Sequence, residues 1–437
     1  MNEDDAREVL GSDARGEAGS AGRGRFRVAA PARRVQYVGL AIGVACLLVL
    51  GVYATYHTYT LKKPGANDFY SRWVGGCALL REGLNPYSET ATLRIQQGVY
   101  GRPALADEDQ VAFAYPLYSL LYFAPLCAVD NYALVQAIWL WLLLVALVAA
   151  VMLWMRVIDW RPSPWLWALT VLWVVLIYHS FRALLLGQFA VFVLLAVVAA
   201  LWAMRHGHDG WAGLFLALAT VKPQMVYLAI AWILIWAAGQ RRWRLWAGFG
   251  TAIAALVIGA MILLPSWLPD FVRQVLTYPD YTVYGSLTWL IVQYWLGLGR
   301  AAEIVVLMGL ALFLLAVGWR LWRGTWEQML WMLGLLVLLT NFFTPRIATT
   351  NYLLLLPWVL WGFCWMQGKW GQKGTWAVVI VEAVSLVGLW ALFLATVEGD
   401  FEQAPVYFPF PAMTAMLLAW LWKQIETRTE FGWQGSG

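Results

Sequence analysis

One aspartate follows the first long apolar stretch of the chain at close range. Asp68 lies about a dozen residues beyond the apolar run 35–56, among the basic residues Lys62, Lys63 and Arg72. A carboxylate held near a membrane surface among basic groups suits a general base that takes a proton from a hydroxyl. The alternative is that Asp68 caps a helix over 69–82, because Asp is a preferred N-cap residue. Both interpretations remain open on the sequence alone.

Three basic residues are expected at the same ends of different apolar runs. Arg182, Lys222 and Arg346 could each hold a phosphate by charge-assisted hydrogen bonds. For each of them singly, snorkelling toward lipid headgroups is the favoured interpretation. Three such cations on one face favour an anionic ligand over three independent lipid contacts.

Two further motifs carry polar groups that could bind a substrate or a metal. Gly187-Gln188 opens an apolar run, where Gly permits close approach and Gln can bond a sugar or the backbone. Asp107-Glu108-Asp109 mimics the metal-binding motif of soluble nucleotide-sugar transferases. The sequence predicts no nucleotide-binding fold, so this run is interpreted as a solvated acidic patch. We therefore expect neither a metal site nor a cofactor.

Glu382 lies within an apolar run, and the cysteines lie apart from one another. An intramembrane carboxylate is a functional candidate by default, and Glu382 is the best argument for a transporter. The four cysteines form no CxxC pair, which argues against a zinc site or a redox motif. A disulfide between Cys77 and Cys127 is the less favoured alternative to free thiols.

The composition indicates a membrane protein. Of 437 residues, 62% are hydrophobic and 13% are charged, whereas soluble domains carry about 25% charged residues. The chain contains 30 Trp and 19 Tyr, residues that gather at membrane–water interfaces. The net charge of +5 comes from basic residues that punctuate apolar runs, which argues against a nucleic-acid surface. We expect an all-α, multi-spanning membrane protein.

Hydropathy divides the chain into a transmembrane domain between two polar tails. Residues 1–34 form a tail too poor in apolar side chains to fold alone, 35–422 form the transmembrane catalytic domain, and 423–437 form a second tail. About 20 apolar residues are needed to cross the hydrocarbon. The sequence predicts twelve spans on this criterion, near 35–56, 132–155, 164–181, 189–204, 209–222, 224–238, 244–264, 301–319, 326–342, 350–366, 375–396 and 407–422.

The distribution of Lys and Arg predicts the orientation of these spans. With the seven Arg of the first tail in the cytoplasm, the basic loops alternate so that both termini are cytoplasmic. The broken apolar segments 113–129 and 285–299 are then interpreted as helices lying on the outer face. The expected external segments are the long loop 57–131 with its surface helices, 182–188, 222–224, 265–300, 343–349 and 397–406.

Short motifs in a fixed order resemble a known family. Asp68-Phe69, Gly83 to Tyr87 (GLNPY), Tyr115-Pro116, Gly187-Gln188 and Lys222-Pro223 follow one another in the chain. This order resembles the polyprenol-phosphate-sugar-dependent glycosyltransferases of family 87, membrane enzymes of the C-type (GT-C) fold, over roughly residues 35–366. Two segments depart from the family pattern. Gly285 precedes Ser286 where the family carries Asn, and 344–352 (TPRIATTNY) replaces a stretch rich in Trp and His.

The resemblance implies an inverting sugar transfer from a lipid phosphate, without nucleotide or metal. It implies that Asp68 is the catalytic aspartate, that Lys222 belongs to the family's Lys-Pro pair, and that Asn85, Tyr87 and Tyr115 join the substrate site. We expect a plasma-membrane hexosyltransferase, mannose being the favoured sugar, that acts on a glycolipid or envelope glycan at the external face. The missing His residues leave the sugar and the acceptor open. The alternatives are a secondary transporter and a lipid-carrier ligase or flippase.

Overall fold

The computed structural model describes residues 30–63, 65–105, 108–277, 285–399 and 402–430. The chain divides into two units, residues 1–50 and 51–437. The first unit contains most of helix α1 (Ala30–Thr55), which begins before the predicted boundary at residue 35. The second unit contains the remaining elements and every candidate site residue, and the description below concerns this unit.

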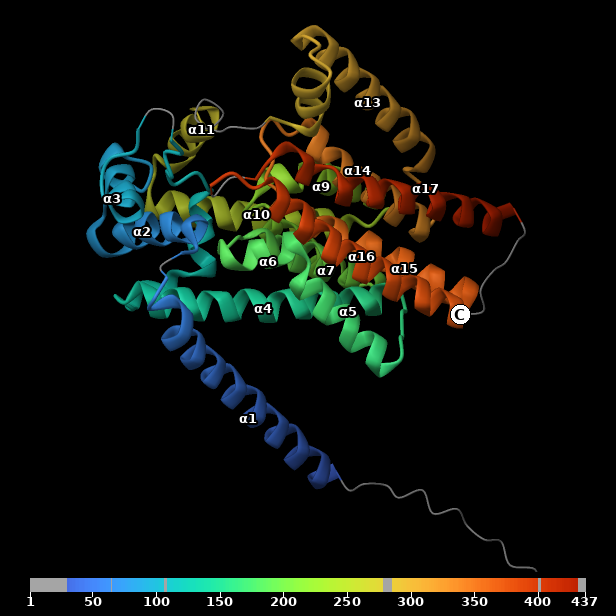
Figure 1. Cartoon of the computed structure of the whole chain (residues 1–437), viewed down its shortest axis with the longest axis horizontal. Helices are drawn as coiled ribbons and strands as arrows, with labels where there is room; N and C mark the ends of the chain where they lie inside the picture. The colour runs from blue at the N-terminus through green and yellow to red at the C-terminus, as the bar shows by residue number, and fades with distance from the viewer. Residues whose placement is uncertain (1–29, 64, 106–107, 278–284, 400–401, 431–437) are drawn as a thin grey trace, which may run out of the picture. The chain divides into compact units, whose positions relative to one another are not determined.

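The second unit consists of α-helices joined by short 3-10 and π segments (Figure 1). Its α-helices are α2 (Asn67–Glu82), α3 (Glu89–Tyr100), α4 (Tyr132–Val157), α5 (Pro164–Leu176), α6 (Tyr178–Leu185), α7 (Ala190–Arg205), α8 (Asp209–Ala219), α9 (Tyr227–Gly239), α10 (Trp243–Leu263), α11 (Trp267–Thr277), α12 (Leu287–Trp289), α13 (Arg300–Leu321), α14 (Trp326–Phe343), α15 (Leu356–Trp370), α16 (Gln372–Thr396) and α17 (Pro409–Glu430). The 3-10 segments are η2 (Leu117–Tyr122), η3 (Ala124–Ala128), η4 (Pro223–Met225), η7 (Thr349–Leu355) and η8 (Ala404–Tyr407), and the π segments are η1 (Tyr56–Thr60) and η6 (Leu290–Trp295).

The helical membrane class is confirmed, but the count of twelve spans is not. Within the described ranges, seven helices are long and apolar enough to cross a membrane. An eighth span results if α5 and α6, which meet at a bend of 57°, are counted as one. The seven are Ala41–Thr60, Tyr132–Val157, Trp243–Leu263, Arg300–Leu321, Trp326–Phe343, Gln372–Thr396 and Ala404–Thr427.

The difference between the predicted and the observed spans lies mainly in the middle of the chain. The predicted spans 189–204, 209–222 and 224–238 are helices of 16, 11 and 13 residues, shorter than the ~20 residues that cross the hydrocarbon. Most side chains of α7 are buried, so its apolar run reflects a core position and not only contact with lipid. The predicted span 350–366 begins instead as the 3-10 segment η7.

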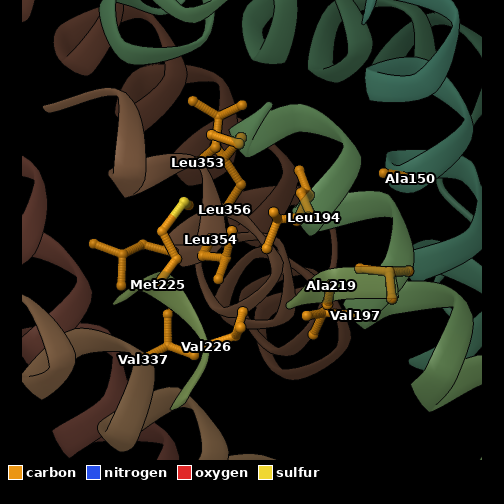
Figure 2. Packing of buried hydrophobic residues seen from close by; sticks show 14 of the residues in the cluster. Ala150, Leu194, Val197, Ala219, Met225, Val226, Val337, Leu353, Leu354 and Leu356 are labelled. Atoms are coloured by element: carbon orange, nitrogen blue, oxygen red, sulfur yellow. The ribbon is translucent and has the colours of Figure 1, made fainter. Parts of the chain in front are cut away.

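The core packs around α7, which lies against α4, α8 and η7. Two glycines allow α8 to cross α10 closely: a Cβ on Gly213 or Gly248 would collide with the backbone of the other helix, and small residues serve the same purpose at membrane helix crossings. Figure 2 shows buried hydrophobic residues of this core at close range. They include Leu194, Val197, Ala219, Met225, Val226, Val337, Leu353, Leu354 and Leu356.

The segment 113–129 is not the single surface helix that was predicted. It forms the two 3-10 segments η2 and η3 and folds back on α2, where Trp73 Nε1 donates to the Leu126 carbonyl at 3.3 Å. A disulfide joins Cys77 of α2 to Cys127 of η3, so the expectation of free thiols was wrong. The contact is non-local, and the spacing of the cysteines alone does not reveal it.

Candidate active site

Asp68 lies in the first turn of α2 but does not cap it. The helix starts after Ala66, which has a left-handed conformation at φ 55°, and no side chain caps this end. Asp68 Oδ2 instead accepts a hydrogen bond from Gln188 Nε2 at 2.6 Å, and Oδ1 lies 3.9 Å from Arg72 Nη1. The capping interpretation is therefore wrong. The Asp68 side chain remains 34% exposed, so part of it stays open while the rest contacts the protein.

Gly187 explains how Gln188 approaches α2. Its φ is +71°, and a Cβ there would lie 2.6 Å from Phe69 Cβ, so a side chain at this position has neither an easy conformation nor room. The Gly187 carbonyl accepts a hydrogen bond from Trp139 Nε1 at 3.0 Å, and the Trp139 ring stacks on Phe69 with centroids 4.1 Å apart. These contacts hold the turn against the helix that carries Asp68.

Lys222 is buried behind Gln188. It lies between α8 and η4, outside the candidate spans, and is 5% exposed. Its ammonium donates to Gln188 Oε1 and to Asn351 Oδ1, both at 2.8 Å. Gln188 thus accepts from Lys222 through its oxygen and donates to Asp68 through its nitrogen, and only one orientation of the amide satisfies both. Asp68, Arg72, Gln188, Lys222 and Asn351 together are called the Asp68 cluster below.

The Asp68 cluster holds a cation without a directly bonded carboxylate. Burial lowers the pKa of the Lys222 ammonium to about 8; Asp68 opposes this shift and the positive charge of Arg72 adds to it. Both hydrogen-bond acceptors of Lys222 are neutral amides. A buried cation with so little compensating charge favours the binding of an anion.

Tyr115 contacts Arg72 of the Asp68 cluster, whereas Tyr87 bonds to the Tyr115 backbone and Asn85 bonds to α11. The Arg72 guanidinium lies over the Tyr115 ring, 4.4 Å from its centroid, and burial raises the pKa of the Tyr115 phenol above its usual range. Tyr87 Oη donates to the Tyr115 carbonyl at 2.6 Å. Asn85 Nδ2 donates to Asp270 of α11 at 2.9 Å. Tyr87 and Asn85 thus hold the backbone and α11 in place.

Arg182 belongs to a second cluster. Its Nε lies 3.1 Å from Glu402 Oε1, and the hydroxyl of Tyr178 donates to the same oxygen at 2.5 Å. Thr349 Oγ1 also donates to Glu402, and Tyr407 Oη donates to Oε2 at 3.3 Å. Tyr178, Arg182, Thr349, Glu402 and Tyr407 are called the Glu402 cluster. Arg182 was predicted to hold a phosphate, and the structure gives it a carboxylate partner within the protein.

The turn that carries Arg346 packs near the turn of Lys222. Thr344, two residues earlier, donates from Oγ1 to the Gln224 carbonyl at 3.2 Å, and Arg346 itself is partly buried. Of the four predicted cationic or amide ligands, the structure therefore joins Gln188 directly to Lys222, brings the Arg346 turn close to them, and assigns Arg182 to the second cluster.

The segment at Gly285 leaves no room for the family's asparagine. A Cβ on Gly285 would lie 2.6 Å from Cγ of Trp289, and Ser286 accepts the Trp289 N–H as a helix cap at 2.9 Å. Tyr284, which precedes Gly285, lies outside the described residues. The departure from the family pattern is thus accommodated by a tight turn.

The acidic run 107–109 is only partly described, because Asp107 lies outside the described residues. Glu108 pairs with Arg102 at 2.7 Å, which holds the pKa of the Glu108 carboxyl well below its usual range. Asp109 accepts the Val111 N–H at 2.9 Å. Among the residues with assigned positions, no group of three or more His, Cys, Asp or Glu could hold a metal ion.

Glu382 contacts a neighbouring helix and not the Asp68 cluster. Its Oε1 accepts a hydrogen bond from Thr170 of α5 at 2.6 Å, and the residue is 2% exposed. Its Oε2 has no hydrogen-bond partner in the described part of the chain. A single hydroxyl partner on the next helix provides no ion path, which weakens the transporter interpretation.

Sequence reasoning assigned no site role to Asn351 of the Asp68 cluster or to four members of the Glu402 cluster, Tyr178, Thr349, Glu402 and Tyr407. Arg72 was expected only as one of the basic groups near Asp68, although its i+4 spacing places the two side chains on one helix face. Asn351 was hidden within the predicted span 350–366. Glu402 was assigned only to an acidic loop, and nothing in the sequence links it to Arg182.

The family model for Glycosyltransferase family 87 matches residues 113–345, more than half of the chain. The match includes Tyr115, Gln188 and Lys222, whereas Asp68 and Asn351 lie outside it. A comparison with curated proteins gave no match. Because the match covers more than half of the sequence, the chain belongs to glycosyltransferase family 87.

Proposed function

We propose that this protein transfers a hexose, mannose being the first candidate, from a polyprenyl phosphate to a hydroxyl of a glycolipid or envelope glycan. The transfer inverts the anomeric centre in one displacement and uses neither nucleotide nor metal. A membrane glycosyltransferase is what the family match supports in general. The donor, the sugar and the mechanism are inferred from the Asp68 cluster.

The observation that carries the proposal is that one amide, Gln188, binds both the carboxylate of Asp68 and the ammonium of Lys222. A base and a cation are thereby held at a fixed separation. The acceptor oxygen attacks the anomeric carbon while its proton passes to Asp68. The bond from the anomeric carbon to the phosphate oxygen breaks, and the polyprenyl phosphate leaves with the electron pair. General base catalysis of this kind typically contributes about 10²–10⁴-fold.

Lys222 suits the leaving phosphate. An ammonium has three donors, and two of them are engaged by Gln188 and Asn351, so one remains for a phosphate oxygen. Positive charge aimed at the site where negative charge develops is a strong form of catalysis in a site that excludes water. Arg72 adds a second cation beside Asp68, and Arg346 is the candidate for an outer phosphate contact.

A lipid-linked donor fits the position of this site among helices that can cross a membrane. The cluster draws on the segments between such helices, with Asp68 after Ala41–Thr60 and Asn351 after Trp326–Phe343. The polyprenyl tail then stays in the bilayer while the phosphate and the sugar occupy the cluster. This arrangement explains transfer without a separate soluble catalytic domain.

The disulfide supports an external site in the plasma membrane. Disulfides persist in oxidising compartments, and Cys77 lies in the same helix as Asp68. The arginine-rich first tail favours a cytoplasmic N-terminus, and we extend this to both termini. Single cysteines at Glu89 and at Asp130, in a background that keeps the disulfide and replaces Cys46 and Cys364 by Ser, should both react with an impermeant maleimide from outside. Labelling of the Asp130 position only from the cytoplasm would contradict this topology.

Turnover of lipid-linked sugars tests the function itself. Purified protein in nanodiscs should release polyprenyl phosphate from polyprenyl-phosphate mannose or polyprenyl-phosphate glucose when a glycolipid fraction supplies the acceptor. Asp68→Asn serves as the matched inactive control. The product should carry the opposite anomeric configuration from the donor. Absence of transfer from both donors, with folded protein and a broad acceptor fraction, would overturn the proposal.

A further inference from the structure

We propose that Glu402 is a positioning residue for sugar transfer, because it fixes the 3-10 segment η7 so that Asn351 can hold the Lys222 ammonium. The inference rests on the proposed function, since it assigns Lys222 to the leaving phosphate. It adds a role for a loop carboxylate that does not itself belong to the Asp68 cluster.

Glu402 is occupied by partners from three different elements. It receives hydrogen bonds from Tyr178 of α6, Thr349 of η7 and Tyr407 of η8, and Arg182 of α6 completes the set with an ion pair. The Glu402 side chain is 7% exposed. Three of these donors reach Oε1, and Tyr407 reaches Oε2, so both oxygens of this nearly buried carboxylate are engaged within the protein. Glu402 is therefore suited to hold elements together and not to react.

The segment η7 contributes one residue to each cluster, and these residues are two positions apart. Thr349 donates to Glu402, and Asn351 accepts from Lys222. Both are buried, Thr349 at 0% and Asn351 at 8% exposure. A 3-10 helix has three residues per turn, so side chains two positions apart point in different directions. η7 thus lies between the Asp68 cluster and the Glu402 cluster, and a shift of Thr349 displaces Asn351.

The 3-10 segment η7 depends on contacts with neighbouring elements to keep its conformation. The 3-10 hydrogen bonds are less favourable than those of an α-helix, and runs of more than three or four residues are uncommon, yet η7 extends over seven residues. Tyr352 supplies a second tie, since its hydroxyl donates to the Tyr407 carbonyl at 3.0 Å. The contacts of Glu402 and Tyr407 therefore fix η7 from one side.

The consequence for catalysis passes through Lys222. Its ammonium has two acceptors in the described residues, Gln188 and Asn351. If Asn351 moves away, Gln188 alone holds the ammonium, and the phosphate meets a less ordered cation. Losing Glu402 should therefore have the same effect as losing the Asn351 amide, and the two losses should not multiply.

A double-mutant cycle tests this coupling. Glu402→Gln keeps the size of the side chain and removes the charge, Asn351→Ala removes the acceptor, and the third variant combines both. We expect each single change to lower kcat/KM for the lipid donor by about tenfold, mainly through KM. The kcat/KM of the double variant should be no more than about twofold lower than that of the less active single variant. Glu398→Gln, an exposed residue of the same loop, is the matched control and should stay within twofold of wild type. Multiplying losses in the double variant, or normal kcat/KM in Glu402→Gln, would overturn the inference.

Two further measurements keep the result decisive. If Glu402→Gln does not fold, Thr349→Val removes only the hydroxyl that reaches Glu402, and it should give the same cycle with Asn351→Ala. Hydrogen exchange of the 349–355 amides requires no activity. It should accelerate in Glu402→Gln but not in Glu398→Gln, and unchanged exchange would refute the positioning role. Faster exchange in a protein without any transferase activity would instead refute the proposed function and leave the structural coupling intact.

Discussion

The two polar clusters contain similar kinds of charged groups and differ in how completely these groups are satisfied. Each combines a carboxylate with a nearby cation. The Glu402 side chain is 7% exposed and receives donors from four residues. The Asp68 side chain is 34% exposed and receives one strong hydrogen bond, from Gln188. A satisfied carboxylate holds a fold together, whereas an incompletely satisfied one can take up a proton.

The cations of the two clusters differ in the same way. Arg182 is paired directly with Glu402, so its charge is already compensated within the protein. Lys222 is bound by two neutral amides, and its charge is available to an incoming anion. From sequence alone both residues were candidate phosphate ligands. The structure separates them because a cation's role depends on which acceptors lie within reach, and not on its residue type.

Asp68→Asn should give the largest effect. Asn is nearly isosteric and keeps an oxygen that can accept the Gln188 N–H, but it cannot take the acceptor's proton. We expect kcat to fall by at least about a hundredfold, with donor affinity little changed. Single-turnover kinetics and a donor-binding assay separate the two steps. Asp130→Asn, a change of the same kind at a residue whose side chain is 91% exposed, is the control and should behave as wild type. Near-normal turnover in folded Asp68→Asn would remove this residue from the mechanism.

Lys222→Met should give the next largest effect and should sharpen the contrast between the cations. Removal of the ammonium should lower kcat/KM for the donor by about ten- to a hundredfold. The apolar replacement removes a buried charge without a carboxylate partner, so thermal stability should be unchanged or higher. Both are measured in the same detergent. A large fall in melting temperature together with normal turnover would assign Lys222 to the architecture.

Part of this comparison could be predicted from the sequence. Asp68, Gln188 and Lys222 were identified because each is a polar residue at the edge of an apolar run, and such edges are few and visible. The helical membrane class was correct for the same reason. Asn351 was missed because its neighbours are apolar enough to mask a 3-10 segment as part of a span.

Other features depend on contacts between distant segments. The pairing of Cys77 with Cys127 requires 113–128 to fold back on α2, and the pairing of Arg182 with Glu402 joins residues on opposite halves of the chain. Neither contact leaves a local pattern of spacing or hydropathy. The count of twelve spans is not confirmed, because burial within a core produces the same apolar runs as burial in lipid.

The pH dependence of turnover should report the uncompensated charge of Lys222. The pKa of this group is lowered to about 8 in the folded protein, below its usual value near 10.4, and the protonated form is the one that binds phosphate. kcat/KM for the donor should therefore be constant below about pH 8 and fall by up to about tenfold per unit above it, until it reaches the level of Lys222→Met. A bound phosphate stabilises the protonated form of Lys222, so the corresponding high-pH limb of the profile, in which kcat falls, should appear at higher pH. In Lys222→Met this limb should be absent, and its persistence there would assign the titration to another group.

The same shift bears on stability, with a definite sign. A lysine whose pKa is lowered on folding disfavours the folded state while it is protonated. This cost is fully present below about pH 8 and is relieved as the pH rises toward the unfolded value. Wild-type stability relative to Lys222→Met should therefore improve over this range, which thermal denaturation of the two proteins at pH 7 and pH 9.5 can measure.

Arg182→Met should affect stability more than chemistry. The change leaves Glu402 buried without its cation. Breaking a buried ion pair from one side costs about 3–5 kcal/mol, and less here because the Arg182 side chain is 23% exposed. We expect a lower melting temperature and a loss of kcat/KM of only a few fold, the opposite of the pattern for Lys222→Met. A hundredfold loss of kcat in a protein of normal stability would return Arg182 to the list of phosphate ligands.

Chelation should give the smallest effect, and it tests whether the Asp68 cluster is truly left open for substrate. A divalent cation at Asp68 would satisfy its carboxylate and would remove the difference from Glu402. The positive charge that the leaving phosphate requires can come instead from Lys222 and Arg72, and the neighbouring Glu108 is already engaged by Arg102. Turnover measured in excess EDTA should therefore stay within about twofold of the untreated enzyme, since the stabilising charges belong to the chain. Loss of turnover in EDTA that Mg²⁺ or Mn²⁺ restores would mean that Asp68 works through a metal, with Asp109, on which the Asp68 charge acts, as a candidate partner.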